Sequence, residues 1–364
     1  MYIIKPNPFD GSDLNTKTLS FGKMYTISCT LFKQESQSYF LSMEAFFMKV
    51  VTFEDIKALG IGPLTCLDWV QTAIARKREA LLPPKISLKP FDGVFCNVMP
   101  SMLPHDQMGL TGGVKIVTRY PNREPSLESR LLLMNAQTGE FLALMDATWI
   151  TTMRTGAVAA HSIMLFGKDD FSVIGMMGLG NTARATLNVL AAAMPDRKFT
   201  VKLLRYKNQH ELFIERFASY KNLAFSVVDT AEDMVKGSHV VVSGATYLPK
   251  DICEDRCFDK GVLVVPIHTL GFTNCDLFFD KVFADDTGHV CHFKNYDKFK
   301  KFAEVCDVVN GIIPGRESQE ERILAYNIGI SLHDINFAAN IFMMLNHDTL
   351  PDIDMHDPIE KFWA

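Results

Sequence analysis

The sequence predicts an α/β protein with a largely antiparallel sheet in its first half and a doubly wound parallel sheet in its second half. Two observations carry this prediction. Up to residue 146, segments of strand length follow one another with turn residues between them, whereas from residue 151 short apolar strands alternate with helical segments. Such alternation is typical of βαβ units with right-handed crossovers. At 364 residues the chain exceeds the usual size of one domain, which favours two.

The composition is that of an ordinary globular protein, with 48% hydrophobic and 22% charged residues. The net charge of -5, without any Lys/Arg block, gives no attraction to nucleic acid or to an anionic membrane surface. No apolar run is long enough to cross a bilayer, and Met1–Pro6 lacks the features of a signal peptide, so we expect a cytoplasmic protein. The eight cysteines have neither disulfide-framework nor zinc-site spacing, so we expect reduced thiols and no metal.

The first half is predicted from its strand and turn signals. A helix over Leu67–Leu81 is ended by Pro83-Pro84, and Gly112-Gly113 and Gln137-Thr138-Gly139 are turn signals, the latter joining two strands as a hairpin. The predicted strands are Tyr25–Phe32, Lys85–Leu88, Gly93–Met99, Gly113–Thr118, Ser129–Asn135 and Phe141–Asp146.

In the second half a helical period begins at Thr151 and precedes a series of short strands. These predicted strands are Phe171–Met177, Phe199–Leu204, Ala224–Val228, His239–Ser243, Val262–Pro266 and Lys281–Ala284. A long apolar helix over Ala325–Leu345 comes too late to extend this sheet economically, so we expect it to return to the first domain. The predicted domains are therefore residues 150–313, which bind the cofactor, and residues 1–149 with 314–364, which form a discontinuous substrate-binding and dimerisation domain.

A glycine-rich turn lies where the first strand of the parallel sheet meets its helix. The pattern Gly178-x-Gly180-x-x-Ala183 allows a tight turn, a close backbone approach to phosphate, and tight packing of the helix on the strand. It predicts a Rossmann domain that binds a dinucleotide pyrophosphate through Gly178, Gly180, Asn181, Thr182 and Ala183. The alternative is a purely structural glycine turn.

The end of the next strand bears on the choice between NAD and NADP. An acid there binds the ribose hydroxyls of NAD, whereas a basic residue accommodates the extra phosphate of NADP. Here Arg205 and Lys207 follow the strand and no acid does. A solvated turn would explain these charges equally simply, but the pattern slightly favours NADP over NAD.

Several motifs in order resemble the ornithine cyclodeaminase/mu-crystallin family over Val51–Leu345. They are Pro83-Pro84-Lys85, Met99-Pro100, Gly113-Val114-Lys115-Ile116-Val117-Thr118, Thr138-Gly139-Glu140-Phe141-Leu142-Ala143, Asp146, Thr151-Thr152-Met153-Arg154-Thr155-Gly156-Ala157, the glycine turn, Pro314-Gly315-Arg316 and Gly329. The resemblance implies a homodimer in which a substrate domain and a Rossmann domain enclose a cleft.

The resemblance also implies which residues line that cleft. Lys115 and Arg154 occupy positions that bind the substrate α-carboxylate, and Lys85 stands where the family usually has Arg. Without the motifs each would be interpreted as a surface cation. Met99 is a possible pocket wall, although methionine is more often part of a core. On the cofactor side we expect Thr155, Ser243 and Gly329 in addition to the glycine turn.

The reaction implied by the family is NAD(P)-dependent chemistry at an amino-acid α-carbon through an imine, and ornithine cyclodeamination to proline and ammonia is the leading hypothesis. Cyclodeaminases carry an Asp where this chain has Gly271-Phe272, so His268 or Asp276 would have to serve as the base. A lone His at a strand end is more often structural. The alternatives are a ketimine reductase or amino-acid dehydrogenase, and a non-catalytic, crystallin-like protein that binds cofactor or another ligand.

Overall fold

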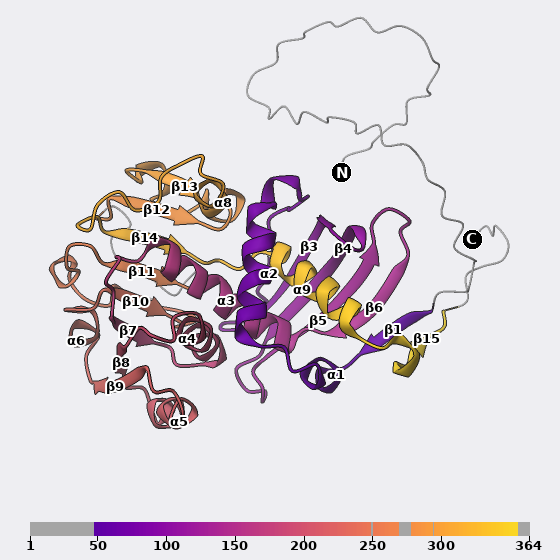
Figure 1. Cartoon of the computed structure of the whole chain (residues 1–364), viewed down its shortest axis with the longest axis horizontal. Coiled ribbons are helices and arrows are strands. Elements are labelled where there is room, and N and C mark those ends of the chain that lie inside the picture. Colours follow the sequence, from indigo (N-terminus) through magenta and orange to yellow (C-terminus); the bar gives the residue numbers. More distant parts are fainter. Residues whose placement is uncertain (1–46, 249, 269–277, 294, 356–364) are drawn as a thin grey trace, which may run out of the picture. The chain divides into compact units, whose positions relative to one another are not determined.

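The structure is a computed structural model that describes residues 47–248, 250–268, 278–293 and 295–355. The chain divides into two units, Met1–Ala45 and Phe46–Ala364, and the description below concerns the second unit. The predicted strand Tyr25–Phe32 and the candidate base Asp276 lie outside the described residues. The second unit contains two sheets with helices packed on them (Figure 1). The predicted combination of a mixed, largely antiparallel sheet with a doubly wound parallel sheet is confirmed.

The first sheet pairs its strands antiparallel except for the parallel pair β1 and β6. In spatial order its strands are β15 (Asp352–Ile353), β1 (Met48–Val51), β6 (Phe141–Asp146), β5 (Leu127–Asn135), β4 (Gly109–Arg119), β3 (Phe95–His105) and β2 (Ile86–Leu88). The hairpin predicted at Gln137-Thr138-Gly139 joins β5 to β6, with Gly139 at a φ of 83°.

The turn predicted at Gly112-Gly113 is wrong, because both glycines lie inside β4. A Cβ on Gly113 would come within 2.3 Å of the Leu132 carbonyl oxygen and 2.8 Å of Ile335 Cδ1. Glycine is therefore needed there for close packing of a helix on the sheet. The turn itself lies at residues 106–108, between the paired ends His105 and Gly109.

Helices from both ends of the chain cover one face of the first sheet. Helix α9 contacts β3, β4 and β5, and α2 packs between α9 and α3 (Figure 1). Helix α2 is shorter than predicted, since it ends at Ala75 and a 3₁₀ turn follows. The helical segments of this half are α1 (Phe53–Ala58), α2 (Pro63–Ala75), η1 (Lys77–Glu79), α3 (Thr148–Phe166), α9 (Ser331–Met344) and η4 (His347–Thr349).

The second sheet is parallel at every pair of neighbouring strands. In spatial order it contains β13 (Phe302–Glu304), β12 (Lys281–Ala284), β14 (Ile323–Tyr326), β11 (Leu263–Pro266), β10 (Val240–Ser243), β7 (Val173–Met177), β8 (Phe199–Leu204) and β9 (Leu223–Val228). Chain order runs outward from β7 in one direction and resumes with β10 on the other side. The topological switch point, where such sheets bind ligands, therefore lies between β7 and β10.

The helical segments of the second half connect these strands. They are α4 (Asn181–Ala193), α5 (Gln209–Arg216), α6 (Ala231–Val235), η2 (Asp255–Cys257), α7 (Thr287–Val290), η3 (Tyr296–Lys298) and α8 (Val305–Val309). None of the helices in the part of the chain that the structure describes has the length and apolar character needed for a membrane span.

The helix predicted over Ala325–Leu345 starts later than expected. Residues Ile323–Tyr326 form β14, a fully buried strand between β11 and β12, and α9 begins only at Ser331. Gly329, at a φ of 78°, separates the two elements. The parallel sheet therefore extends beyond residue 313, while α9 packs on the first sheet and β15 pairs with β1 of that sheet.

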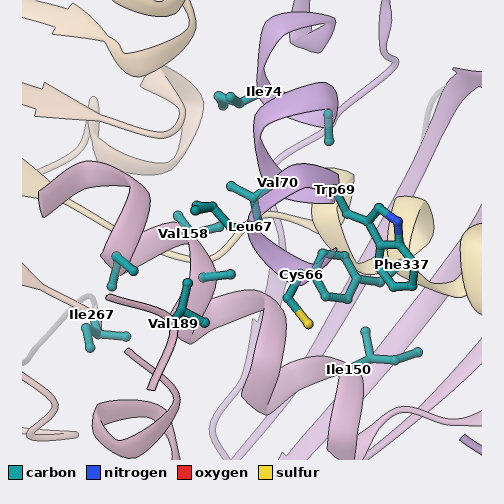
Figure 2. Packing of buried hydrophobic residues seen from close by; sticks show 14 of the residues in the cluster. Cys66, Leu67, Trp69, Val70, Ile74, Ile150, Val158, Val189, Ile267 and Phe337 are labelled. Atoms are coloured by element: carbon teal, nitrogen blue, oxygen red, sulfur yellow. The ribbon is translucent and has the colours of Figure 1, made fainter. Parts of the chain in front are cut away.

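One hydrophobic cluster continues from the helices of the first sheet into the second half. Figure 2 shows Val70 of α2 among the side chains of this cluster, with Val158 of α3 and Val189 of α4 nearby. The rings of Trp69 and Phe337 pack edge to face with their centroids 5.0 Å apart, and this contact joins α2 to α9. This shared core holds the elements that carry the candidate site.

Candidate active site

The glycine turn lies at the carboxyl edge of the parallel sheet, at its switch point. Gly178 has a φ of 68°, and a Cβ there would come within 2.3 Å of the backbone at Gly244 and Ala245, so the turns after β7 and β10 are in contact. At Gly180 a Cβ would meet nothing within 4 Å. Gly180 is also the N-cap of the 13-residue helix α4 and makes no side-chain capping bond.

The backbone N–H groups of Asn181, Thr182 and Ala183 in the first turn of α4 follow this open position. An open approach to unpaired N–H groups at the start of a helix fits a dinucleotide pyrophosphate. Ser243 ends the neighbouring strand β10, fully buried. The turn therefore combines an open backbone position at Gly180 with the start of α4, beside the buried end of β10.

One of the two cations in the turn after β8 is paired with a carboxylate from the end of a neighbouring strand. Arg205 Nε donates to Asp229 Oδ1 at 2.6 Å, and its Nη1 lies 3.1 Å from His210 Nε2. Lys207 has a φ of 51°, and its Nζ lies 5.5 Å from the centre of the Tyr206 ring. The acid that pairs with Arg205 is therefore Asp229, directly after β9. With Lys207 included, the turn after β8 keeps an excess of positive charge.

Two cations of the predicted carboxylate site share one buried carboxylate oxygen. Lys115 Nζ on β4 and Arg154 Nε on α3 lie 2.7 and 2.8 Å from Asp334 Oδ1 on α9. Lys115 and Asp334 are fully buried and Arg154 nearly so. The three charges sum to one positive charge inside the protein. Burial, followed by the charge of Arg154, lowers the pKa of Lys115 to about 7, while Asp334 opposes this shift.

The guanidinium of Arg154 extends beyond its ion pair with Asp334. Its Nη1 is buried and has no hydrogen-bond partner among the described residues. A Cβ on Gly329 would come within 2.7 Å of that atom, so the backbone after β14 lies against the guanidinium. Gly329, expected on the cofactor side, thus packs on the guanidinium of Arg154. A buried donor without a partner is costly unless a ligand satisfies it.

Asp334 was missed by the reasoning from sequence. The signal that could have found it is the single carboxylate of a helix whose residues are mostly apolar, among them Leu332, Ile335 and Phe337. Buried carboxylates are rare without a positive partner, so such a residue points to unidentified cations nearby.

Lys85 joins this site from the segment before β2. Its Nζ donates to the Ile328 carbonyl oxygen at 3.0 Å. Burial, followed by the charge of Arg154, lowers the pKa of Lys85 to about 8, and Asp285 opposes the shift. Arg154 and Asp334 both change the pKa of Lys85 through their charges. We therefore count Lys85 with Lys115 and Arg154 as the cation cluster of the site.

His268 follows β11 at the same edge of the sheet and is partly exposed. Burial, then the positive charges of Lys85, Arg154 and Arg119, lowers the pKa of His268 to about 4. The imidazole is therefore neutral near pH 7 and lies within the field of the same cations.

Asp285 closes the site at the end of β12. Its Oδ2 accepts from Gly329 N at 2.9 Å, whereas its buried Oδ1 has no hydrogen-bond partner among the described residues. Burial raises the pKa of this carboxyl group. Residues from β4, α3, α9 and the segment before β2 thus lie near the ends of β11, β12 and β14 in one electrostatically coupled group.

The remaining predicted residues have other surroundings. Met99 is buried opposite Lys115 in the sheet register and is part of the core. Thr155 Oγ1 donates to the Thr151 carbonyl oxygen within α3. Arg205 and Lys207 lie at the end of β8, beyond the glycine turn and apart from the cation cluster. In the described ranges no set of three or more His, Cys, Asp or Glu side chains is placed to hold a metal ion.

Comparison with known proteins gives a family and a fold. The sequence profile of the ornithine cyclodeaminase/mu-crystallin family matches residues 49–347. Alanine dehydrogenase from Archaeoglobus fulgidus is 25% identical over 285 residues, which cover 72% of this chain and 84% of the enzyme.

Two solved structures share the fold. Thermococcus litoralis Δ1-pyrroline-2-carboxylate reductase, in complex with NADH and L-proline, superimposes with a TM-score of 0.74 at 21% identity, covering 84% of this chain and 100% of the other. An archaeal alanine dehydrogenase dimer with bound NAD gives a TM-score of 0.73 at 22% identity, covering 85% of this chain and 99% of the other.

Proposed function

Because the chain belongs to the ornithine cyclodeaminase/mu-crystallin family, we propose that it catalyses NAD(P)-dependent chemistry at the α-carbon of an amino or imino acid through an α-imine. The observation that carries this proposal is the buried cluster of Lys115 and Arg154, which share one carboxylate oxygen and leave a net positive charge. A buried excess of positive charge with a free guanidinium donor favours an anionic ligand of the size of an α-carboxylate.

We assign the binding of the substrate carboxylate to three cations, each from a different element of the fold. Arg154 Nη1 supplies the free donor, and Lys115 and Lys85 add positive charge from a strand and from the segment before β2. Holding the carboxylate from rigid elements fixes the α-carbon beside the cofactor edge of the second sheet. A dinucleotide whose pyrophosphate is held at the glycine turn would accept or supply the hydride at that carbon through its nicotinamide ring. Lys85, whose pKa is lowered to about 8, can exchange a proton near neutral pH.

Within this class we favour net oxidation or reduction, as in an amino-acid dehydrogenase or ketimine reductase, over ornithine cyclodeamination. Cyclodeamination requires a second ammonium group and a base to deprotonate it. The positive charges of Lys85, Arg154 and Arg119 around His268 oppose an ammonium there, and with a pKa lowered to about 4 His268 is a weak base at neutral pH.

For the cofactor we propose NADP in preference to NAD. Arg205 and Lys207 follow β8, and Asp229 neutralises only one of these two cations. A 2′-phosphate would find a guanidinium with donors beyond the paired Nε. Tighter binding of NADH than of NADPH would refute this assignment.

For the assembly we propose a homodimer formed by the outer face of the first sheet. Alternate residues of its strands place Val98, Val114, Ile116, Leu132 and Leu144 on that face. Ile116 is 43% exposed and Leu144 37% exposed. A sheet face with several partly exposed apolar side chains is typical of an interface.

The test is a panel of substrates with both cofactors. We expect the purified protein to reduce a cyclic α-imino acid, such as Δ1-pyrroline-2-carboxylate, with loss of the nicotinamide absorbance. Arg154→Lys should lower kcat/KM by about 100-fold, because a point charge cannot replace the guanidinium fork. Arg256→Lys, at an exposed ion pair with Glu254, is the matched control and should leave kcat/KM unchanged.

Other outcomes decide between the alternatives. Proline and ammonia formed from ornithine and NAD, without a net change in nicotinamide absorbance, would favour cyclodeamination instead. Saturable cofactor binding without turnover of any amino or imino acid would contradict the catalytic proposal and favour a crystallin-like binding protein.

A further inference from the structure

The segment that carries Lys85 is attached to the second half of the molecule through His289. The backbone N–H of Lys85 donates to His289 Nε2 at 3.2 Å. A Cβ on Gly288 would come within 3.1 Å of Pro84 Cγ, so the short helix α7 packs directly on this segment. The position of Lys85 is thus set by an element that follows β12, at the carboxyl edge of the parallel sheet.

This hydrogen bond fixes the tautomer of His289. Because Nε2 accepts from Lys85, the proton is on Nδ1, which donates to Asp286 Oδ2 at 2.6 Å. Asp286 also accepts at Oδ1 from Lys77 Nζ at 2.7 Å, and Lys77 reaches Glu304 Oε2 at 2.6 Å. The ring therefore has one orientation and one protonation pattern that satisfy both neighbours.

The network is buried and joins the two halves. The side chain of His289 is 2% exposed and that of Lys77 5% exposed. Lys77 belongs to η1, next to the first sheet, whereas Glu304 ends β13 and accepts from the backbone of Thr287 at 2.7 Å. Paired charges of this kind are held rigidly, because releasing one partner leaves the other buried and uncompensated.

We propose that His289 is a positioning residue that holds Lys85 in the substrate site, with Asp286 and Lys77 fixing its ring. This inference rests on the proposed role of Lys85 at the substrate carboxylate. With its backbone held, Lys85 Nζ reaches the Ile328 carbonyl between the two halves, where Asp285, Arg154 and Asp334 act on it.

Two amide variants separate the two nitrogens of His289. In His289→Gln the amide oxygen reaches the position of Nε2 and can accept from Lys85, whereas the amide of His289→Asn reaches only the position of Nδ1 near Asp286. We expect His289→Asn to lower kcat/KM for the imino acid by about tenfold and His289→Gln to retain most of it. Equal losses in both variants would mean that the residue is only structural and would overturn the proposal.

A second measurement does not depend on turnover. The rate at which acetic anhydride acetylates Lys85, with release of acetate, is followed by mass spectrometry across pH. It gives the titration midpoint of Lys85 Nζ, with the exposed Lys89 as reference. We expect a wild-type midpoint near pH 8, kept in His289→Gln and raised by about one unit or more in His289→Asn, because the released lysine becomes solvated.

This labelling distinguishes the two possible failures. A midpoint unchanged in folded His289→Asn would overturn the positioning role, whatever the activity. Absence of turnover in the wild type, together with the expected shift, would contradict the proposed function and leave the attachment of Lys85 to His289 intact.

Discussion

At the scale of single residues, the site is defined by a shortage of negative charge. Asp334 Oδ1 serves both Lys115 and Arg154, while Asp334 Oδ2 and Arg154 Nη1 are buried without hydrogen-bond partners among the described residues. Such an arrangement costs stability in the absence of ligand, because neither the extra cation nor the free polar atoms are compensated. Unfavourable local electrostatics of this kind are typical of sites built to bind a charged group.

Replacing Asp334 should expose this cost. In Asp334→Asn the two cations lose their shared partner, and we expect the free energy of unfolding to fall by about 3–5 kcal/mol, as when one member of a buried pair is removed. The loss should be larger below pH 7, where Lys115 is charged, than well above it, where the lysine is neutral and only Arg154 lacks a partner. Chemical denaturation at about pH 6 and about pH 9 measures both values.

The double variant Lys115→Met/Asp334→Asn tests the origin of that loss. Removing Lys115 together with Asp334 should recover part of the free energy of unfolding that Asp334→Asn alone loses. The recovery should be largest at low pH, where Lys115 is charged. Asp196→Asn, an exposed acid, is the control and should change little. Equal losses at both pH values, without coupling between the two positions, would contradict the assignment of Asp334 as their common partner.

Titration of the two lysines should appear in the pH dependence of catalysis. The pKa of Lys115 is lowered to about 7 and that of Lys85 to about 8, so both lose charge as the pH rises through this range. If both bind the carboxylate as cations, log kcat/KM should fall above pH 8 with a slope approaching about two, because kcat/KM reports the free enzyme.

Lys85→Arg should reduce that slope to about one, since an arginine stays charged throughout the range. Lys89→Arg, nearby and exposed, should leave the profile unchanged. A slope unaffected by Lys85→Arg would mean that titration of Lys85 does not limit substrate binding.

At the scale of elements, the glycine turn and its helix form the unit that would hold the cofactor. Gly180 and Gly62 make a matched pair, since each is an extended helix N-cap without a side-chain bond, and a Cβ at either would meet nothing within 4 Å. We expect both alanine variants to keep the wild-type Tm. Gly180→Ala alone should weaken NADPH binding by about tenfold or more, because its methyl group points into the space for the pyrophosphate.

Isothermal titration of both variants with NADPH and NADH checks this expectation. Equal weakening by Gly62→Ala would point to a general effect of helix capping. Unchanged binding by Gly180→Ala would move the pyrophosphate away from this turn.

Elements were predictable from the sequence where the signal is local. The hairpin at residues 137–139 and the strand–turn–helix at Gly178 depend on residues adjacent in the chain, and both are confirmed. The errors at Gly112-Gly113 and at β14 have a common cause. Gly113 faces a helix more than 200 residues later in the chain, and Ile323–Tyr326 is apolar enough for either a helix or a buried strand until its neighbours are known.

The residues of the site also differ in whether a local sequence signal identifies them. Lys85, Lys115 and Arg154 were found through short motifs that imply a family, and the structure gathers them in one field. Asp334 and His289 were not found, because their significance comes from contacts 219, 180 and 204 residues away. A single sequence gives no measure of such pairing, although a lone acid within a mostly apolar helix is a signal that can be searched for.

At the scale of the whole molecule, the first sheet must place Lys115 on one face and the apolar residues of β4 on the other. Because side chains alternate along a strand, Lys115 points toward α9 while Val114 and Ile116 point away from it. The outer face carries Ile116 with Val98 and Arg130 beside it in the register, and Leu132 beside Val114 and Leu144. The strand that carries Lys115 is therefore also the strand that would bury its other face against a second copy.

We expect a molar mass in solution of twice 40.9 kDa. Ile116→Glu should shift the protein to the monomer, because a charge at the centre of an apolar interface costs more than the contact gains. Light scattering coupled to size exclusion measures the mass. Leu212→Glu, at an equally exposed position on α5, is the control and should leave it unchanged.

The same variant tests whether assembly supports the site. Ile116 and Lys115 are adjacent on β4, so loss of the second copy should loosen the strand that carries the cation and raise KM for the imino acid while leaving cofactor affinity near wild type. A monomer with unchanged KM would separate assembly from substrate binding. A dimer that persists in Ile116→Glu would place the interface on another surface.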